Sequence, residues 1–453
     1  MAETPRTEPP TAGTTPAGAA GLRRGAWTAT FLAFAFMLLN FADKAALGFA
    51  GSALMRDLGI TPAEFGVLQS SFFWLFAVGA LVVGALSTRI SVRVLLPTLM
   101  GIWILTMVPL LFPVGFGLLL VCRVVLGFAE GPAYALATHV VHSWFPPEKR
   151  ALPAGVISAG SSVGPLIAAP VLTLVIATWD WHAAFLVLIV AGLVWLVTWF
   201  LLSRPSPEEA ATRAPGTDGT RRGHTGTDWR LLVRQLRTPT ILGVALLAFV
   251  GYWTTTLRVS WLPLYLEQGL GYDALAAGRL VTAPYAVAAV AAVGAGYLSN
   301  RMIARGVSRR WARGGLSVAF VVAGGVSMYL FTAVPPGAVQ VVMVALAFSL
   351  NSAAYGVALT IVSDLVPPGH RGAVLGCLVA FYSMAGVIAP LVLGFSIGDG
   401  ADVSTGYGHG FAISAVVIVV GSLLSLVLIN PERDLGRLDE HGHGEVAPAW
   451  SGR

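Results

Sequence analysis

Charge is scarce in this sequence of 453 residues, and lysine is almost absent. Asp, Glu, Lys and Arg together make up 11% of the chain, whereas soluble globular proteins contain about 25%. Only Lys44 and Lys149 among the 28 basic residues are lysine, and 56% of all residues are apolar. This composition excludes a soluble domain and predicts an all-α protein that crosses a membrane many times.

Other absences exclude whole classes of function. The two cysteines, Cys122 and Cys377, lie in apolar segments and provide neither a disulfide framework nor metal-ligand spacing. His139 and His142 have a spacing that helical metal ligands can use, but no third ligand accompanies them. The sequence contains no nucleotide-binding loop and no pairing of nucleophile and base. We therefore expect no enzyme, no cofactor and no metal.

Twelve segments are apolar over the roughly 20 residues that a bilayer-spanning helix needs. They lie near 27–52, 63–86, 94–112, 115–139, 151–175, 182–202, 239–264, 274–299, 312–333, 337–362, 372–396 and 409–430. The polar stretch 203–238 divides them into six plus six. The predicted organisation is a disordered cytoplasmic tail (1–26), a six-helix bundle (27–202), a cytoplasmic central loop (203–238), a second six-helix bundle (239–430) and a cytoplasmic tail (431–453).

The arginines indicate an orientation for the predicted bundle. Loops on one side contain most of them, including Arg150 and Arg371, whereas the other side is richer in acids such as Asp180 and Asp273. Lys and Arg collect in cytoplasmic loops. We therefore expect both termini in the cytoplasm and a multi-pass protein in the lipid bilayer of the plasma membrane. The net charge of +6 follows from this topology and does not indicate nucleic-acid binding.

Two sequence patterns occur once in each predicted half. "GALSTRISVR" at 84–93 matches "GYLSNRMIAR" at 296–305, and "PPEKRALPAG" at 146–155 matches "PPGHRGAVLG" at 367–376. Each pair falls in the corresponding loop of its half. The repeat predicts two six-helix pseudo-repeats, which is typical of alternating-access transporters that bind their substrate between the halves. A duplicated channel is the alternative.

Four charged residues lie well inside the first and fourth predicted spans. Asp43 and Lys44 stand in the first span, and Arg123 and Glu130 stand in the fourth. A charge near the centre of a span costs roughly 3 kcal/mol or more and usually faces the interior of the bundle. Helical rise places Asp43 and Arg123 at similar depths, with Glu130 on the same face as Arg123. We expect the four to share one cavity, either as static ion pairs or as a site where bases hold an anion and acids carry protons.

These features resemble a known family of membrane proteins. The twelve spans, the central loop and the paired G-x-L-x-x-R-x-x-x-R loops resemble the major facilitator superfamily. Within it, "NFADKAALG", "LQSSFFWLFAVGAL", "RVVLGFAEGPAY", "WFPPEKRA" and "WLPLYLEQGLGYD" resemble the anion:cation symporter family. The resemblance implies proton-coupled transport of organic anions and extends over most of residues 27–430.

The resemblance also implies roles for the charged residues. Asp43 and Glu130 would couple protons, and Lys44 and Arg123 would hold the carboxylate of the substrate. The family usually has Arg at the position of Lys44. Because an ammonium group is a point charge and not a planar fork, we expect less bidentate carboxylate binding here.

Four arginines lie in the repeated loops: Arg89, Arg93, Arg301 and Arg305. The resemblance implies that they act in gating, and positive-inside anchoring is the alternative. The family usually has an acid before the first arginine of each loop, where this chain has Thr88 and Asn300. A charge network that includes those acids is therefore in question.

Five further positions complete the predicted substrate site: Phe76, Ser161, Arg258, Asn351 and Tyr382. Family members often carry Tyr at the position of Phe76 and Gln near Ser161, so this part of the site is less polar than the resemblance implies. We expect Arg258 either to enter the cavity or to extend toward the membrane surface. Packing is the alternative role for Asn351 and Tyr382.

The leading prediction is a monomeric secondary transporter that moves a small organic anion together with protons by alternating access. A proton-driven exporter of drugs or metabolites is one alternative, because "GSSVGPLIAA" at 160–169 partly matches the G-x-x-x-G-P motif of exporters. A transporter-like membrane receptor is another, although neither tail nor the central loop is long enough to suggest a signalling domain.

Overall fold

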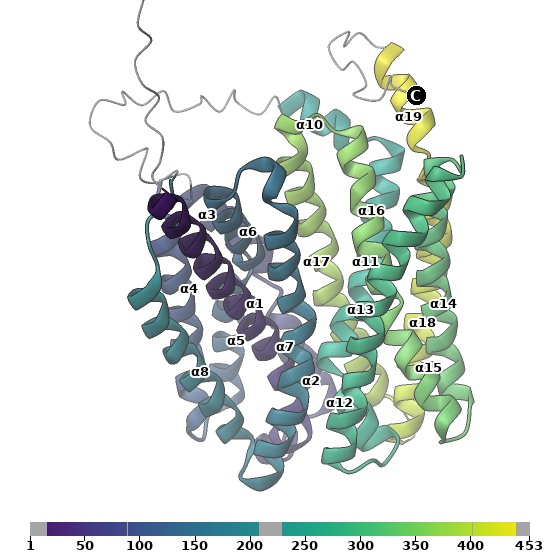
Figure 1. The fold of residues 1–453 in the computed structure, drawn as a ribbon. Helices are drawn as coiled ribbons and strands as arrows, with labels where there is room; N and C mark the ends of the chain where they lie inside the picture. The colour runs from purple at the N-terminus through teal and green to yellow at the C-terminus, as the bar shows by residue number, and fades with distance from the viewer. Residues whose placement is uncertain (1–15, 88, 208–228, 401, 441–453) are drawn as a thin grey trace, which may run out of the picture.

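The structure is a computed structural model that describes residues 16–87, 89–207, 229–400 and 402–440. Every regular element in these ranges is a helix. Figure 1 shows two groups of helices side by side, α1–α8 and α11–α18. The start of α1, together with α10 and α19, lies at one end of the molecule, which we call the terminus face. The other end is called the opposite face.

The helices of the two halves have the following bounds. The first half contains α1 (Pro16–Leu58), α2 (Pro62–Ser71), α3 (Phe76–Leu86), α4 (Val92–Met107), η1 (Val108–Leu111), α5 (Phe116–Glu130), α6 (Ala133–Trp144), η2 (Pro147–Lys149), α7 (Ala151–Thr178) and α8 (Trp181–Leu202). The second half contains α10 (Trp229–Leu236), α11 (Pro239–Ser260), α12 (Leu262–Leu264), η3 (Tyr265–Gly269), α13 (Ala274–Ala304), η4 (Arg310–Gly315), α14 (Leu316–Ala333), α15 (Ala338–Ser349), α16 (Asn351–Leu365), α17 (Pro368–Gly398), α18 (Val403–Leu428) and α19 (Pro431–Glu440).

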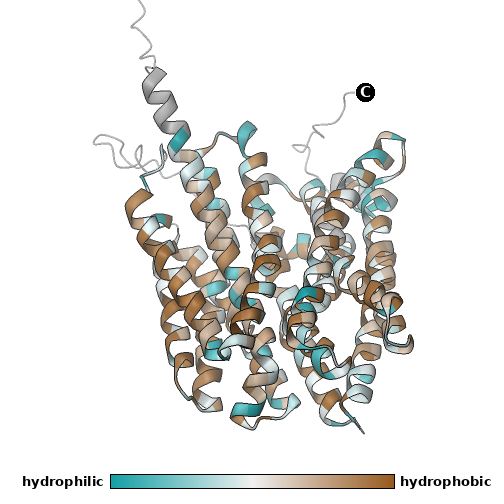
Figure 2. Ribbon diagram, turned by 60° about the horizontal axis from the view of Figure 1, so that its bottom comes forward, coloured by the Kyte–Doolittle hydropathy of each residue, from teal (hydrophilic) through white to brown (hydrophobic). Residues whose placement is uncertain are grey.

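The surface of the bundle suits a lipid environment. Within the described ranges, 11 helical segments are long and apolar enough to cross a membrane. The remaining crossing combines α15 and α16, which are separated at Leu350. Large apolar side chains such as Leu105, Val194 and Val293 are exposed along the helices, and Figure 2 shows hydrophobic residues over most of the ribbon. The predicted all-α membrane fold is confirmed.

The two halves repeat the same hydrogen bonds as well as the same sequence pattern. Arg150 donates from Nε to the Phe145 carbonyl and from Nη2 to the His142 carbonyl, both at 2.9 Å. Arg371 donates from the same atoms to the Val366 and Ser363 carbonyls, at 2.9 and 2.6 Å. Each arginine therefore caps the end of the preceding span, so the repeated loop is a structural device in both halves.

Two broken spans lie against each other in the first half. The break between α2 and α3 falls at residues 72–75, and that between α5 and α6 falls at Gly131 and Pro132. A Cβ atom at Gly127 would overlap the Phe72 carbonyl, and one at Gly131 would overlap the Phe76 carbonyl. Glycine is required at both positions because the two backbones touch. The contact brings Glu130, at the end of α5, next to the aromatic residues of the other break.

The ends of the chain and the central segment contain more helix than the sequence predicted. Helix α1 begins at Pro16, inside the predicted tail 1–26, α10 lies in the predicted loop 203–238, and α19 lies in the predicted tail 431–453. Asp434 attaches α19 to α11 by accepting hydrogen bonds from the Thr240 amide (3.0 Å) and hydroxyl (2.7 Å). These short polar helices lack the long apolar run by which spans were identified, and residues 1–15, 208–228 and 441–453 lie outside the described ranges.

The halves touch each other near the opposite face. Gly66 of α2 packs on the Pro390 carbonyl and on Gly394 of α17, and Gly278 of α13 packs on Thr173 of α7. Ser52, near the end of α1, donates a 2.6 Å hydrogen bond to Glu267 of η3. These contacts join the ends of the spans on that side of the molecule.

Candidate functional site

The four charged residues predicted inside the membrane come together between α1 and α5. Asp43, Arg123 and Glu130 are buried, with exposed fractions of 2%, 4% and 1%. The Lys44 side chain is 12% exposed, and its Nζ lies 3.1 Å from Glu130 Oε2. The predicted convergence is therefore what the structure shows, and we call these four residues the charged set.

Asn40 links Lys44 to Glu130. Its Nδ2 donates to Glu130 Oε2 at 2.8 Å, and its Oδ1 accepts from Lys44 Nζ at 2.7 Å. Glu130 Oε2 thus receives both the amide and the ammonium. Sequence reasoning missed Asn40, although its position four residues before Lys44 placed both on one face of a helix.

Asp43 and Arg123 have fewer direct partners. In the part of the chain that the structure describes, no N–H or hydroxyl group donates to the Asp43 carboxyl, which lies next to the Glu130 carboxyl, and Glu130 Oε1 and Arg123 Nε also lack partners of this kind. The Asp43 carboxyl nevertheless lies within electrostatic range of Arg123, Lys44 and Glu130. With all four groups ionised, the charged set sums to zero, which lowers the cost of burying it.

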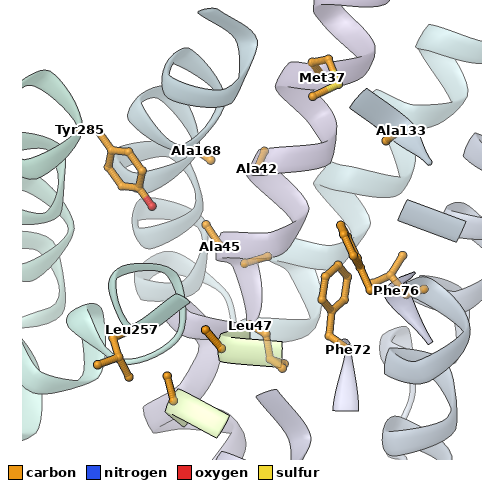
Figure 3. Packing of buried hydrophobic residues seen from close by; sticks show 14 of the residues in the cluster. Met37, Ala42, Ala45, Leu47, Phe72, Phe76, Ala133, Ala168, Leu257 and Tyr285 are labelled. Carbon is orange, nitrogen blue, oxygen red and sulfur yellow. The ribbon is translucent and has the colours of Figure 1, made fainter. Parts of the chain in front are cut away.

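Aromatic rings surround the two cations. Lys44 Nζ lies 4.6, 5.5 and 5.7 Å from the ring centroids of Phe41, Phe76 and Phe72, and the Arg123 guanidinium lies 4.9 Å from that of Phe72. Such placement stabilises a cation by roughly 0.5–2 kcal/mol per favourable contact. Figure 3 shows Phe72 and Phe76 next to each other in the apolar packing.

The rings continue into the second half. Phe73 meets Tyr252 of α11 edge to face at 5.8 Å between centroids, and Tyr252 lies 5.0 Å from Tyr382 of α17. Phe73 also contacts Phe72 at 4.9 Å and Phe76 at 5.7 Å. We call these five residues, Phe72, Phe73, Phe76, Tyr252 and Tyr382, the aromatic row. It includes two predicted site residues, Phe76 and Tyr382, and three that sequence reasoning missed.

The other predicted substrate residues already bind protein groups. Ser161 Oγ donates to the Ser158 carbonyl at 2.7 Å. Asn351 Nδ2 donates to the Gly251 carbonyl at 2.9 Å and to Thr255 Oγ1 at 2.8 Å, which fixes the start of α16 against α11.

Arg258 is 8% exposed and does not extend to the membrane surface. Its Nη1 donates to the Phe348 carbonyl at 2.9 Å, and its guanidinium lies 4.4 Å from the Tyr285 ring centroid. It therefore caps α15 at the break before α16.

The loop arginines lie at the terminus face. Arg93 donates to the Ser203 carbonyl at 2.9 Å, and Arg301 donates to the Tyr297 hydroxyl at 3.2 Å. Arg89 and Arg305 are exposed. Gating by these residues stays a prediction, and Thr88 falls outside the described ranges. Among the described residues, no group of three or more His, Cys, Asp or Glu side chains could hold a metal ion.

Comparison with known proteins identifies the family, related sequences and a similar fold. The pattern of the Major Facilitator Superfamily matches residues 32–390. The hexuronate transporter of Bacillus subtilis (strain 168) is 25% identical over 407 residues, which cover 87% of this chain and 92% of that protein. The D-galactonate transporter of Escherichia coli O6:H1 is 27% identical over 441 residues, which cover 93% and 99%. In fold, a bacterial homolog of the human lysosomal transporter Spinster matches with a TM-score of 0.74 at 18% identity, covering 94% of this chain and 99% of that one.

Proposed function

We propose that this chain moves a small carboxylate together with protons by alternating access. The chain belongs to the Major Facilitator Superfamily and is a transporter related to carriers of organic anions. Like its relatives, it is not an enzyme. The proposal places the protein in the plasma membrane as a monomer. Both termini would lie in the cytoplasm, because Lys and Arg collect in cytoplasmic loops and the start of α1 lies at the same end of the molecule as α10 and α19.

The observation that carries the proposal is the pairing of Lys44 with Glu130 at 3.1 Å. While Glu130 is ionised, it occupies the ammonium group that a substrate carboxylate would bind. A proton on Glu130 removes that competitor, so the anion and the proton favour each other's binding. Arg123 supplies the second positive charge, and Asp43 supplies a second carboxyl that can take up a proton.

The position of the charged set supports movement between the halves. All four residues belong to the first half, whereas Tyr252 and Tyr382 of the aromatic row belong to the second. A ligand that contacts both groups would lie between the halves. Rocking of one half against the other, about contacts such as Gly66 on Gly394, would then expose the ligand to one side of the membrane at a time.

The exporter alternative receives no separate support. The glycines of the 160–169 motif pack on α1, Gly160 on Met37 and Gly164 on the Leu38 carbonyl. Such close approach of two helices is a packing role and does not distinguish export from import.

The test uses purified protein in proteoliposomes and compares proton-driven uptake with exchange of like substrate. We expect Asp43→Asn and Glu130→Gln to abolish accumulation driven by a pH gradient. At least one of them should retain exchange, because exchange requires binding and rocking but no net proton movement. If both variants still accumulate substrate with the wild-type pH dependence, the two acids do not couple protons.

A further inference from the structure

The aromatic row forms a continuous series of ring contacts from one half to the other, with hydroxyl groups only on Tyr252 and Tyr382. Phe72 and Phe76 are buried against the charged set, whereas Phe73, Tyr252 and Tyr382 are half-buried at the boundary between the halves. Gly386 of α17 packs directly on the Phe73 ring. Any ligand whose carboxylate reaches Lys44 and Arg123 therefore lies against aromatic rings with the rest of its body.

Few polar groups near the row are available to a ligand. The Asn40 amide holds Lys44 and Glu130, the Asn351 amide nitrogen binds α11, and Ser161 bonds to its own helix. Tyr134 and Ser158 bind each other at 2.9 Å. Among the described residues, Asn351 Oδ1 and Gln69 Nε2 also lack hydrogen-bond partners, as do the oxygens of Asp43 and Glu130 Oε1, which the proposed cycle uses for protons. A ligand with many hydroxyl groups would leave several of them without partners, and each unmade bond weakens binding about tenfold.

We infer that the transported anion is a carboxylate on an aromatic or similarly flat, apolar body, and not a polyhydroxylated sugar acid. This inference rests on the proposed function, because it takes Lys44 and Arg123 as the carboxylate-binding groups. The flat body would pack on the aromatic row, where the ring pairs at 5.0 and 5.8 Å are already tilted and edge to face.

Binding to purified wild-type protein tests the inference directly. Four probes are compared by calorimetry at one pH: benzoate, phenylacetate, cyclohexylacetate and D-gluconate. We expect phenylacetate or benzoate to bind at least about tenfold more tightly than D-gluconate. Binding of D-gluconate that is equally tight or tighter would overturn the inference and leave a carboxylate transporter. If no carboxylate binds, the proposed function itself fails.

Substitutions in the row separate stacking from general packing. We expect Phe73→Leu and Tyr252→Leu each to reduce the preference for phenylacetate over cyclohexylacetate by about threefold to tenfold, the range found for aromatic pairs. Phe200→Leu is the matched control, because Phe200 is 70% exposed on α8 and lies outside the row. The ratio is measured on protein that elutes as a single species, so lost folding cannot imitate the effect. An unchanged ratio in both variants would overturn the stacking role.

Discussion

Asn40 and Glu130 lie 90 residues apart in the sequence, yet the Asn40 amide donates a 2.8 Å hydrogen bond to the Glu130 carboxylate. The same amide accepts a bond from Lys44 at 2.7 Å. Because the amide is uncharged, it can hold both side chains whether Glu130 is ionised or protonated. Asn40 therefore holds Lys44 and Glu130 next to each other throughout the proposed transport cycle, although the attraction between them weakens when Glu130 is protonated.

Asn40→Ala should reduce initial uptake at least about tenfold, since a hydrogen bond to a charged group contributes roughly 1.5–3 kcal/mol. The pH profile of uptake should also shift, because both bonds reach the proton-carrying pair. Uptake between pH 5 and 8 measures both effects. Thr30→Val is the control, because Thr30 is buried in the same helix and, among the described residues, its hydroxyl bonds to the Ala26 carbonyl of its own helix. An unshifted profile in Asn40→Ala would leave Asn40 with a purely structural role.

Arg123→Ala should abolish anion binding while the protein remains folded. Loss of one member of a buried charged contact costs roughly 2–5 kcal/mol, equivalent to about thirtyfold or more in affinity. Calorimetric titration of the purified variant measures the change. Arg204→Ala, at an exposed arginine of the terminus face, should bind normally. Near-normal affinity in Arg123→Ala would rule out its anion-binding role.

Lys44→Met should lose anion affinity, whereas Lys44→Arg should retain transport because it preserves the charge near Glu130. If Lys44 only forms a structural ion pair, Lys44→Met should lower the melting temperature and leave affinity unchanged. Parallel measurement of affinity and melting temperature for both variants distinguishes the two roles.

Glu267 should make the contact between the halves sensitive to pH. Burial raises the pKa of Glu267, although the hydrogen bond from Ser52 and the charge of Arg56 act in the other direction. Because its pKa is raised in the folded protein, protonated Glu267 stabilises the contact between the halves fully at pH values below the ordinary carboxyl pKa near 4.3. This stabilisation is lost as the pH rises through the raised pKa.

Glu267→Gln cannot ionise, so it should match the wild type at pH 4 and be slightly more stable at pH 8. A gain below about 1 kcal/mol would correspond to a few degrees in melting temperature. Thermal unfolding of both proteins at pH 4 and pH 8 tests this prediction. If the melting temperatures of variant and wild type differ by the same amount at both pH values, the prediction is wrong.

Gly127→Ala should prevent normal folding, because the added Cβ would meet the backbone carbonyl of Phe72. Overpacking of a close-packed interior costs about 1–3 kcal/mol or more, and a backbone atom cannot turn aside. Gly101→Ala is the control, since its Cβ would meet nothing within 4 Å. The yield of monodisperse protein measures the outcome, and equal yields would contradict the close approach.

The sequence predicted the spans well because a bilayer demands long apolar segments. Its apolar pattern placed α7 and α8 within a few residues of their observed bounds. Helical geometry also predicted that Asp43, Lys44, Arg123 and Glu130 meet. The short helices α10 and α19 were missed because their stability depends on tertiary contacts, such as that between Asp434 and Thr240, which a local pattern does not contain.

The sequence could not predict the partners within the site. Whether Lys44 pairs with Glu130 or remains open to a ligand depends on the rotation of α1 against α5, which no local sequence pattern contains. Arg258 illustrates the same difficulty. Its partner is the Phe348 carbonyl, which is available as an acceptor because the helix is broken nearby, between α15 and α16.

The balance of charge within the first half determines how the membrane voltage acts on transport. Two cations and two ionised acids sum to zero, so reorientation of the empty protein moves no net charge of this set across the bilayer. Each unbalanced charge would be driven by about 2.3 kcal/mol per 100 mV. A bound monoanion with one proton keeps the sum at zero, and every further proton adds one positive charge. The voltage dependence of the accumulation ratio that uptake reaches at equilibrium therefore counts the protons that accompany each anion.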